Sequence, residues 1–190
     1  MKIGVLALQG AFIEHIGALT GLGCECAELR QAADLEGIDA LVLPGGESTV
    51  QGKLLRQLGM LEPIKAMIKD GLPVLATCAG LILLAGKIEG GETPHLATLP
   101  VTVARNAFGR QLASFHIRGK LGEWTDVPMT FIRAPYITKA EPAVEVLATV
   151  RNHIVAVKYK NQLALAFHPE LDEDIRLHRW LMQLAESRKA

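Results

Sequence analysis

The chain has 190 residues, enough for one compact domain with a full hydrophobic core. Lys and Arg together number 20, as do Asp and Glu, so the formal net charge is zero and nothing suggests a nucleic-acid partner. No apolar run approaches the roughly 20 residues that a membrane-spanning helix needs, so we expect no membrane segment.

The first half of the chain alternates short apolar segments with helical patterns. Strands are predicted over 3–8, 24–29, 40–43 and 72–76. After the first of these, Phe12, Ile16 and Leu19 recur at helical spacing. A helical stretch follows the third strand and reaches residue 70, and a further helix begins at Gly80. Short apolar strands separated by helices are typical of a parallel sheet covered on both faces.

The second half of the chain has shorter connections between its predicted strands. These strands cover 101–103, 114–121, 129–132, 144–150, 154–159 and 163–167. Asn161 suits a hairpin turn between the last two, so we expect antiparallel strands added to the sheet. An amphipathic helix over 172–188 closes the chain. We therefore predict an α/β fold in a single domain over 1–190, with a mainly parallel central sheet, antiparallel additions and helices on both faces.

Cys78 stands between a predicted strand and a predicted helix. A cysteine in an aliphatic stretch is usually a small structural side chain. However, parallel α/β proteins bind ligands at the carboxyl ends of their strands, and a nucleophile on a strand-to-helix turn needs small neighbours. Ala76 and Gly80 are small, although a glycine is more usual at the first position. Because a helix N-terminus also favours a thiolate, Cys78 is the predicted nucleophile.

His168 is the predicted base, and Glu170 is its predicted partner. His168 ends an apolar segment, and Glu170 follows two residues later. In an extended chain these side chains lie on the same side, about 6.5 Å apart along the strand. The carboxylate could then orient the imidazole and stabilise its protonated form, as in a Ser-His-Asp triad. His-Pro-Glu alone also occurs in surface loops; its combination with the Cys78 turn predicts a Cys-His-Glu triad.

The segment 44–49 contains two glycines directly after a predicted strand. One interpretation is a turn followed by a helix N-cap at Ser48 or Thr49. A compatible interpretation is that the glycines let the backbone approach a ligand closely. The backbone N–H of Gly46, together with that of Ala79, would then form an oxyanion hole.

These features resemble the class I glutamine amidotransferases, and more closely the glutaminase subunits of pyridoxal 5′-phosphate synthase. The triad and the Cys78 turn indicate only the superfamily. Gly-Glu-Ser-Thr, Arg-Asn-x-Phe-Gly-Arg-Gln and Ile-Arg-Ala-Pro indicate the subfamily. The matching segments run in family order over nearly the whole chain, at 4–10, 43–49, 77–85, 105–111, 131–135 and 167–171. The resemblance implies a three-layer, flavodoxin-like fold.

The resemblance also implies a reaction. Cys78 would attack the side-chain amide carbon of L-glutamine to give a γ-glutamyl thioester. His168 would protonate the departing ammonia and then activate the water that releases glutamate. In the family, ammonia passes to a separate (β/α)8-barrel synthase subunit within a large hetero-oligomer, where it is combined with a pentose phosphate and a triose phosphate. Neither a cofactor nor a metal is expected in this chain.

Binding residues follow from the same resemblance. The glutamine-binding positions map to Gly46, Glu47, Ser48, Arg105, Ile132 and Arg133, and the positions near the synthase map to Gln9 and Gly10. Arginines and backbone N–H groups suit the α-carboxylate of free glutamine. Alternatively, Arg105 and Arg110 could form surface ion pairs or structural loop contacts, and Arg133 could hold the turn that follows it.

Two other functions stay open at this point. A class I glutaminase that supplies a different acceptor pathway, such as imidazole glycerol phosphate synthesis, should lack the segment 105–111. A non-enzymatic interaction subunit on this fold would typically have lost the cysteine or the histidine, and both are present. The sequence departs from the family at Ala76 and at Tyr136, where a histidine is expected, and 114–128 matches no family motif.

The remaining cysteines and histidines receive structural interpretations. Three cysteines, in a chain that starts as a strand without a signal peptide, fit a reducing, cytoplasmic location. Cys24 and Cys26 have no further Cys or His at metal-binding spacing, so packing explains them better. The histidines expected at the surface or at helix caps are His15, His95, His153 and His178.

Overall fold

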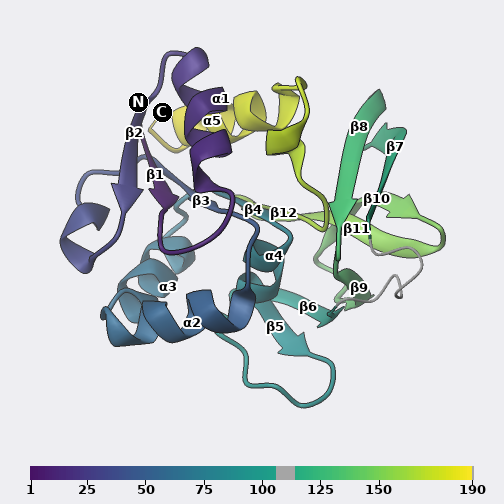
Figure 1. Cartoon of the computed structure of the whole chain (residues 1–190), viewed down its shortest axis with the longest axis horizontal. Coiled ribbons are helices and arrows are strands. Elements are labelled where there is room, and N and C mark those ends of the chain that lie inside the picture. The colour runs from purple at the N-terminus through teal and green to yellow at the C-terminus, as the bar shows by residue number, and fades with distance from the viewer. Residues whose placement is uncertain (106–113, 190) are drawn as a thin grey trace.

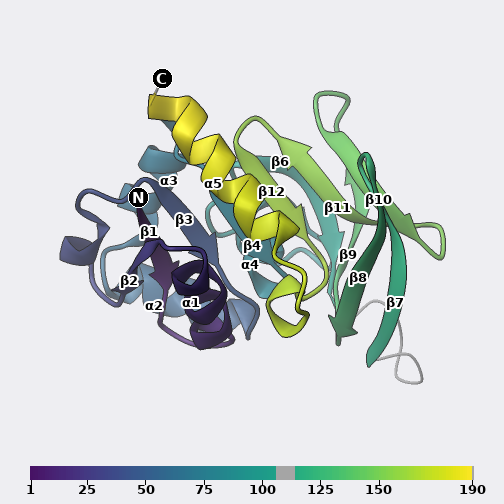
Figure 2. The same cartoon turned by 90° about the horizontal axis from the view of Figure 1, so that it is seen from above.

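The computed structural model describes residues 1–105 and 114–189 as a central sheet between two layers of helices (Figure 1). One face is covered by α1 (Phe12–Gly21) and α5 (Arg176–Lys189). The other face carries α2 (Ser48–Gln57), α3 (Leu61–Lys69) and α4 (Ala79–Leu84) (Figures 1 and 2). The predicted three-layer α/β architecture is confirmed.

Within the described residues, ten strands form the central sheet. Their order begins with the parallel strands β2 (Glu25–Leu29), β1 (Lys2–Leu6), β3 (Ala40–Leu43), β4 (Val74–Thr77) and β12 (Gln162–Leu165). It continues through β11 (His153–Tyr159), β9 (Tyr136–Ala140), β6 (Leu99–Ala104) and β5 (Ala85–Ile88), while β10 (Glu145–Val150) pairs with β11. Because β11 is antiparallel to β12, β9 and β10, the predicted antiparallel additions are confirmed.

Part of the second half folds differently from the prediction. β7 (Ser114–Leu121) and β8 (Trp124–Ile132) form a separate two-stranded sheet. Phe115 stacks on Phe131 with ring centroids 4.5 Å apart, and Phe131 in turn packs against Phe167 at 5.6 Å. These aromatic contacts fix the hairpin beside the central sheet and bring the end of β8 close to the end of β12.

The helical stretch predicted up to residue 70 is divided into α2 and α3. Gly59 lies between them with φ of +65°, a left-handed conformation that glycine adopts without strain. The short strands β5 and β9 were not predicted. Sequence periodicity is weak over such short segments, and both strands depend on pairing with β6.

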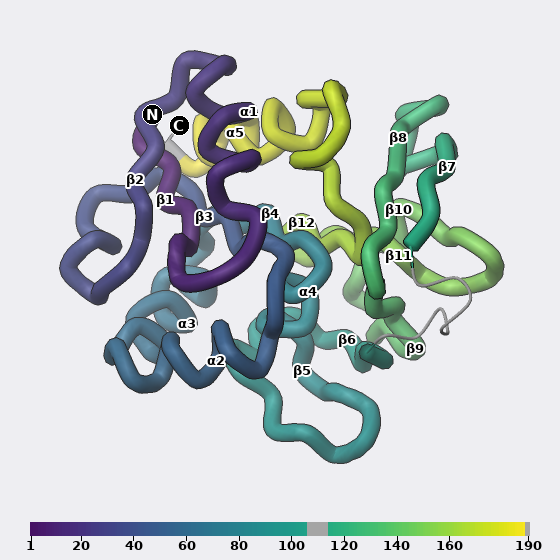
Figure 3. The backbone as a smooth tube through the Cα atoms, in the orientation of Figure 1, coloured from purple at the N-terminus to yellow at the C-terminus, as the bar shows by residue number. Residues whose placement is uncertain are grey.

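The core is aliphatic, and the strands β3, β4 and β12 are buried along their whole length. Burial on both faces explains why these strands are mainly apolar instead of alternating, and their polar residues, Thr77 and Gln162, are hydrogen-bonded. The backbone path places α1, from the start of the chain, on the same face as α5, from its end (Figure 3). In the described part of the chain, no helix combines the length and apolar character needed to cross a bilayer.

Candidate functional site

Cys78 lies directly after β4 and caps the N-terminus of α4, with φ of +48° and ψ of −101°. A positive φ is unusual for a residue with a side chain and persists only where the surroundings enforce it. The Cys78 N–H donates to the Leu165 carbonyl oxygen at 2.8 Å, and a Cβ added at Gly80 would lie 2.1 Å from the Leu43 carbonyl oxygen. The predicted tight strand-to-helix turn is therefore confirmed.

His168 and Glu170 form a buried pair beyond the end of β12. Nδ1 of His168 lies 2.7 Å from Oε1 of Glu170, and the Glu170 side chain has no solvent exposure. The predicted contact is confirmed, but the chain is not extended there. Glu170 sits in the 3-10 helix Pro169–Leu171, whose turn brings its carboxylate back towards the imidazole.

The environment of His168 favours its protonated form. Burial alone would lower the pKa of the imidazole. This effect is outweighed by hydrogen bonds with Cys78 and Glu170 and by the negative charge of both partners, which together raise the pKa of His168 to about 10. Because Nδ1 donates to an anionic carboxylate, Nε2 is left to exchange a proton with the nucleophile or the substrate.

The glycine loop after β3 packs against this pair. A Cβ added at Gly45 would lie 2.3 Å from Cε1 of His168, so only glycine fits against the imidazole. The Gly45 N–H donates to Oγ1 of Thr77 at 3.0 Å, and its carbonyl accepts the Ala11 N–H at 3.1 Å. The loop is thus fixed between β4, the start of α1 and the imidazole.

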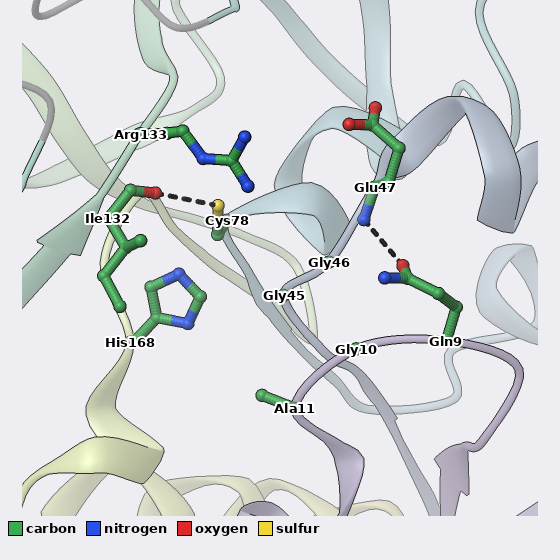
Figure 4. Close-up of a pocket in the computed structure, with 10 residues that line it drawn as sticks. All are labelled: Gln9, Gly10, Ala11, Gly45, Gly46, Glu47, Cys78, Ile132, Arg133 and His168. Carbon is green, nitrogen blue, oxygen red and sulfur yellow. Dashed lines mark hydrogen bonds between the residues drawn. The ribbon is translucent and has the colours of Figure 1, made fainter.

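Gln9 holds the next part of the same loop (Figure 4). Its Oε1 accepts the Glu47 N–H at 2.7 Å, and its carbonyl oxygen accepts a hydrogen bond from Nε2 of Gln51 at 2.9 Å. A Cβ added at Gly46 would lie 2.4 Å from Oε1 of Gln9. Gln9 and Gly10 both line the site, and their expected role at a partner interface stays a prediction.

Two adjoining pockets meet at Cys78. The larger, of about 220 Å³, is shown in Figure 4. It is lined by Gln9, Gly10, Ala11, Gly45, Gly46, Glu47, Cys78, Ile132, Arg133 and His168. The smaller, of about 60 Å³, contains all six predicted glutamine-binding residues, Gly46, Glu47, Ser48, Arg105, Ile132 and Arg133, together with Cys78. The fold therefore brings these residues to one place from distant parts of the chain.

Two charged residues of the smaller pocket, Arg105 and Glu47, are already paired with each other. Arg105 lies 2.7 Å from Glu47 and 2.8 Å from Glu92, so it forms an ion pair at the same position where it lines the pocket. The Ile132 carbonyl oxygen lies 4.0 Å from Sγ of Cys78, and Arg133 follows it with φ of +45°. The rest of the predicted segment, 106–111 with Arg110, lies outside the described residues.

The histidine interpretation is wrong for three of the four residues. His15, His178 and His95 are buried. His15 and His178 contact each other beneath the site, and His95 packs near Arg56. His153 is only partly exposed and stacks on Tyr136 at 3.8 Å.

For His15 and His178, helical spacing in the sequence gave a usable signal of burial. His15 is three residues after Phe12 and four before Leu19, on the apolar stripe of α1. His178 lies three residues after Ile175, which precedes α5, and three residues before Leu181 in α5.

Thr77 was also missed as a loop-positioning residue. Its only sequence signal is its place before Cys78.

Among the residues described, no group of three or more His, Cys, Asp or Glu side chains is arranged to hold a metal ion.

Comparisons with known proteins agree with this geometry. The model of the SNO glutamine amidotransferase family matches residues 5–187. The chain is 56% identical, over 96% of its length and 92% of the relative's, to the pyridoxal 5′-phosphate synthase subunit PdxT of Desulfitobacterium hafniense. It is 50% identical to the PdxT of Streptococcus pneumoniae over 99% of this chain and 100% of the relative.

Solved structures give the same result. A crystal structure of a glutamine amidotransferase superposes with a TM-score of 0.93 at 46% identity, covering 97% of this chain and 98% of the other. A glutamine amidotransferase from Thermotoga maritima, at 15% identity and a TM-score of 0.65 over 99% of this chain and 83% of the other, shares the fold. The chain belongs to the SNO glutamine amidotransferase family.

Proposed function

We propose that this chain, as a single glutaminase domain, is the ammonia-producing subunit of a pyridoxal 5′-phosphate synthase. It hydrolyses L-glutamine with Cys78, His168 and Glu170 as catalytic residues. The observation that carries the proposal is the position of the buried, hydrogen-bonded His168–Glu170 pair at the nucleophile turn, beside a pocket rich in charged groups. The PdxT relatives support the choice of pathway.

Glutamine would bind with its amide over Cys78 and its amino-acid end in the smaller pocket. There, the guanidinium groups of Arg105 and Arg133 suit the α-carboxylate, and the carboxylate of Glu47 suits the α-ammonium. Gly46, Ser48 and Ile132 complete the lining and offer backbone groups. Since Arg105 already pairs with Glu47, the two residues present opposite charges side by side, as a zwitterion requires.

In the first half-reaction His168 already holds the proton of the Cys78–His168 pair on Nε2, and the sulfur of Cys78 attacks the amide carbon. Glu170 stabilises this imidazolium. The backbone N–H groups of Gly46 and Ala79 are assigned to the oxyanion that develops on the amide oxygen. As the carbon–nitrogen bond breaks, His168 returns the proton to the leaving nitrogen, ammonia departs and a γ-glutamyl thioester remains.

In the second half-reaction water attacks the thioester. Once the sulfur is acylated, the negative charge of Cys78 no longer helps to raise the pKa of His168, so its imidazole can now accept a proton. His168 takes a proton from the water, the oxygen bonds to the carbonyl carbon, and the carbon–sulfur bond breaks. Glutamate leaves, and the Cys78–His168 pair is restored with its proton on His168. The same imidazole therefore acts as an acid in the first step and as a base in the second.

The ammonia acceptor is proposed to be a (β/α)8-barrel synthase subunit in a large hetero-oligomer. Gln9 and Gly10 lie on the rim of the larger pocket, and Ile13 follows them with 68% of its surface exposed. An exposed apolar residue beside the pocket mouth suits a partner surface. The free thiols of Cys24, Cys26 and Cys78 support a reducing, cytoplasmic location.

The proposal is tested by measuring glutamate release and pyridoxal 5′-phosphate formation with the purified chain alone, with the synthase subunit, and with Cys78→Ala in place of wild type. We expect weak hydrolysis by the isolated chain, stimulation by the synthase, and loss of both products with Cys78→Ala. Because Cys78 is 7% exposed and alanine is smaller, the variant should still fold and bind the synthase.

The nucleophile, the gating by the partner and the acceptor pathway can each be refuted by a separate result. Retention of more than about 1% of turnover by Cys78→Ala would refute the nucleophile, because loss of a catalytic nucleophile removes nearly all activity. Equal rates with and without the synthase would refute gating by the partner. Glutamate release without pyridoxal 5′-phosphate, in the presence of the sugar phosphates, would point to a different acceptor pathway.

A further inference from the structure

A buried polar chain continues from Glu170 through His15 to His178. His15 in α1 and His178 in α5 have 0% and 1% exposure. Nδ1 of His15 lies 3.0 Å from Nε2 of His178, and Nε2 of His15 lies 3.3 Å from Oε2 of Glu170. Burying two imidazoles behind a catalytic carboxylate costs free energy unless their nitrogens are paired, so their arrangement calls for a specific reason.

Both histidines are held in the neutral form. Burial lowers the pKa of His15 well below its usual range, and the positive charges that His178 and His168 can carry lower it further. Burial also lowers the pKa of His178 to about 4, against a smaller opposing effect from Asp174. At neutral pH each ring therefore has one N–H donor and one bare nitrogen.

The neighbouring groups then define the tautomers. The ionised Glu170 carboxylate only accepts hydrogen bonds, so the proton of His15 belongs on Nε2, facing Oε2. Nδ1 of His15 is left to accept the N–H from Nε2 of His178. Nδ1 of His178 is then bare, which agrees with its having no hydrogen-bond partner among the described residues.

His15 also reaches the glycine loop. Its Nε2 lies 3.3 Å from Oγ1 of Thr77 as well, at the same distance as from Glu170. Thr77 Oγ1 accepts the N–H of Gly45, which packs on the imidazole of His168. The Nε2–H of His15 therefore hydrogen-bonds the side chain that holds the loop, and it lies 3.3 Å from Oε2 of the carboxylate that orients His168, an oxygen with no hydrogen-bond partner among the described residues.

We propose that His15 is a positioning residue for the glutaminase reaction: its Nε2–H bonds to Thr77 and faces Oε2 of Glu170 as an electrostatic partner, while His178 sets its tautomer. This inference rests on the proposed function, since it assigns His15 a role in the same chemistry. His15 does not touch substrate; it acts on His168 through Glu170 and through the Gly45 loop. Without that N–H, the buried carboxylate loses the dipole that faces its Oε2 and is held less firmly against His168, so it stabilises the imidazolium less well.

The test compares His15→Gln with His15→Asn in the complex with the synthase. The amide nitrogen of glutamine can reach the place of Nε2, whereas the shorter asparagine reaches only the place of Nδ1. We expect His15→Asn to lower kcat for glutamine hydrolysis by about 10- to 100-fold, as when the outer partner of a functional histidine is removed. KM should change little, and His15→Gln should recover most of the rate.

The pH profile separates positioning from general loss of structure. In His15→Asn, the alkaline limb at which His168 loses its proton should move to lower pH, while His15→Gln should keep the wild-type limb. His178→Leu should fall between these variants. Melting temperatures of all variants, measured in parallel, show whether a rate change only follows a loss of stability.

A second readout does not depend on glutamine turnover. Alkylation of Cys78 by iodoacetamide, with the signal of Cys78→Ala subtracted, should be slowed at neutral pH in His15→Asn and restored in His15→Gln. Equal alkylation rates and equal pH profiles for both variants would overturn the inference. If iodoacetamide alkylates wild type as expected but wild type does not hydrolyse glutamine, the proposed function fails. The alkylation rates of the variants still decide the role of His15 in that case.

Discussion

The pocket has a chemical side, formed by Cys78, His168 and Glu170, and a binding side that includes Glu47 and Arg105. The two sides are built in opposite ways. On the chemical side, Cys78 and His168 are 7% exposed, the Glu170 side chain is fully buried, and backbone hydrogen bonds fix the positions of Cys78 and His168. On the binding side, the Glu47 side chain is 47% exposed, and the two carboxylates that pair with Arg105 in the described part of the chain are both reached by water. Catalysis requires a preset geometry, whereas binding residues must exchange existing partners for those of the ligand.

The origin of the residues follows the same division. Cys78, His168 and the Gly45 loop come from the carboxyl ends of the neighbouring strands β4, β12 and β3, where parallel α/β sheets place their sites. Arg105 and Arg133 instead follow β6 and β8, in the mixed part of the fold. We therefore expect changes on the first side to lower kcat and changes on the second side to raise KM.

Glu170→Gln should have the largest effect. It keeps the shape of the side chain but removes the charge that stabilises the imidazolium, so kcat should fall by about 10²- to 10⁴-fold, as for the carboxylate of a Ser-His-Asp triad. Steady-state glutaminase kinetics measure it, with the exposed Glu173→Gln as the matched control. A loss of less than about threefold would mean that His168 does not need the carboxylate.

The same variant predicts a shift with pH. In wild type, the raised pKa of His168, about 10, keeps the imidazole protonated through neutral pH, and the proton is lost only as the pH approaches that value. Removing the Glu170 charge removes one cause of the increase while the lowering effect of burial remains. The alkaline limb of kcat/KM should therefore move to lower pH in Glu170→Gln, and an unmoved limb would contradict the assignment of His168 as the acid.

Gly45→Ala should have the next largest effect. Its methyl group would lie 2.3 Å from Cε1 of His168, so the loop or the imidazole must shift. We expect kcat to fall by about 10²-fold, since small displacements of catalytic groups are costly, and the free energy of unfolding to fall by about 1–3 kcal/mol from overpacking. Kinetics and denaturant unfolding measure the two quantities.

Gly17→Ala is the control for Gly45→Ala. Gly17 lies in α1, and nothing lies within 4 Å of the place of its added Cβ. Alanine there should stabilise the fold by about 0.5–1 kcal/mol, because glycine is unfavourable inside a helix. If both substitutions lowered activity equally, the effect could not be assigned to the contact with His168.

Arg105→Met tests the binding side. A charge-assisted hydrogen bond contributes about 1.5–3 kcal/mol, so KM for glutamine should rise by roughly 10- to 100-fold while kcat stays close to wild type. Arg118→Met is a matched control, because Arg118 forms an exposed ion pair with Asp126. A fall in kcat without a rise in KM would place Arg105 on the chemical side instead.

The sequence predicted the chemical side better than the binding side for a physical reason. The Cys78 turn is determined locally by a strand, a helix and small neighbours. Local patterns also predicted the strands 40–43 and 114–121 with their observed ends. In contrast, the pairing of Arg105 with Glu47, 58 residues away, depends on how distant parts of the chain pack together. The separate β7–β8 sheet likewise depends on the stacking of Phe115 and Phe131, which no local pattern reveals.

The errors on His15 and His178 have a different cause. Their spacing along α1 and α5 already indicated burial, but a polar residue type suggested the surface. A buried histidine is stable only if its nitrogens find partners, and those partners are supplied by Glu170, by Thr77 and by the other histidine. Their helical spacing is compatible with burial, but only the assembled fold shows the partners that make the burial stable.

The smallest expected effect is that of Glu92→Gln. Glu92 holds one side of Arg105 at 2.8 Å, and its negative charge opposes the approach of the glutamine α-carboxylate. Exposed ion pairs contribute about 0–1 kcal/mol, so removing this charge should lower KM by up to about fivefold and leave kcat unchanged. Glutaminase kinetics at low and high salt measure the change, which should shrink as salt screens the charge. A rise in KM would show instead that Glu92 braces Arg105 for substrate, and the binding side would then be more preset than its exposure indicates.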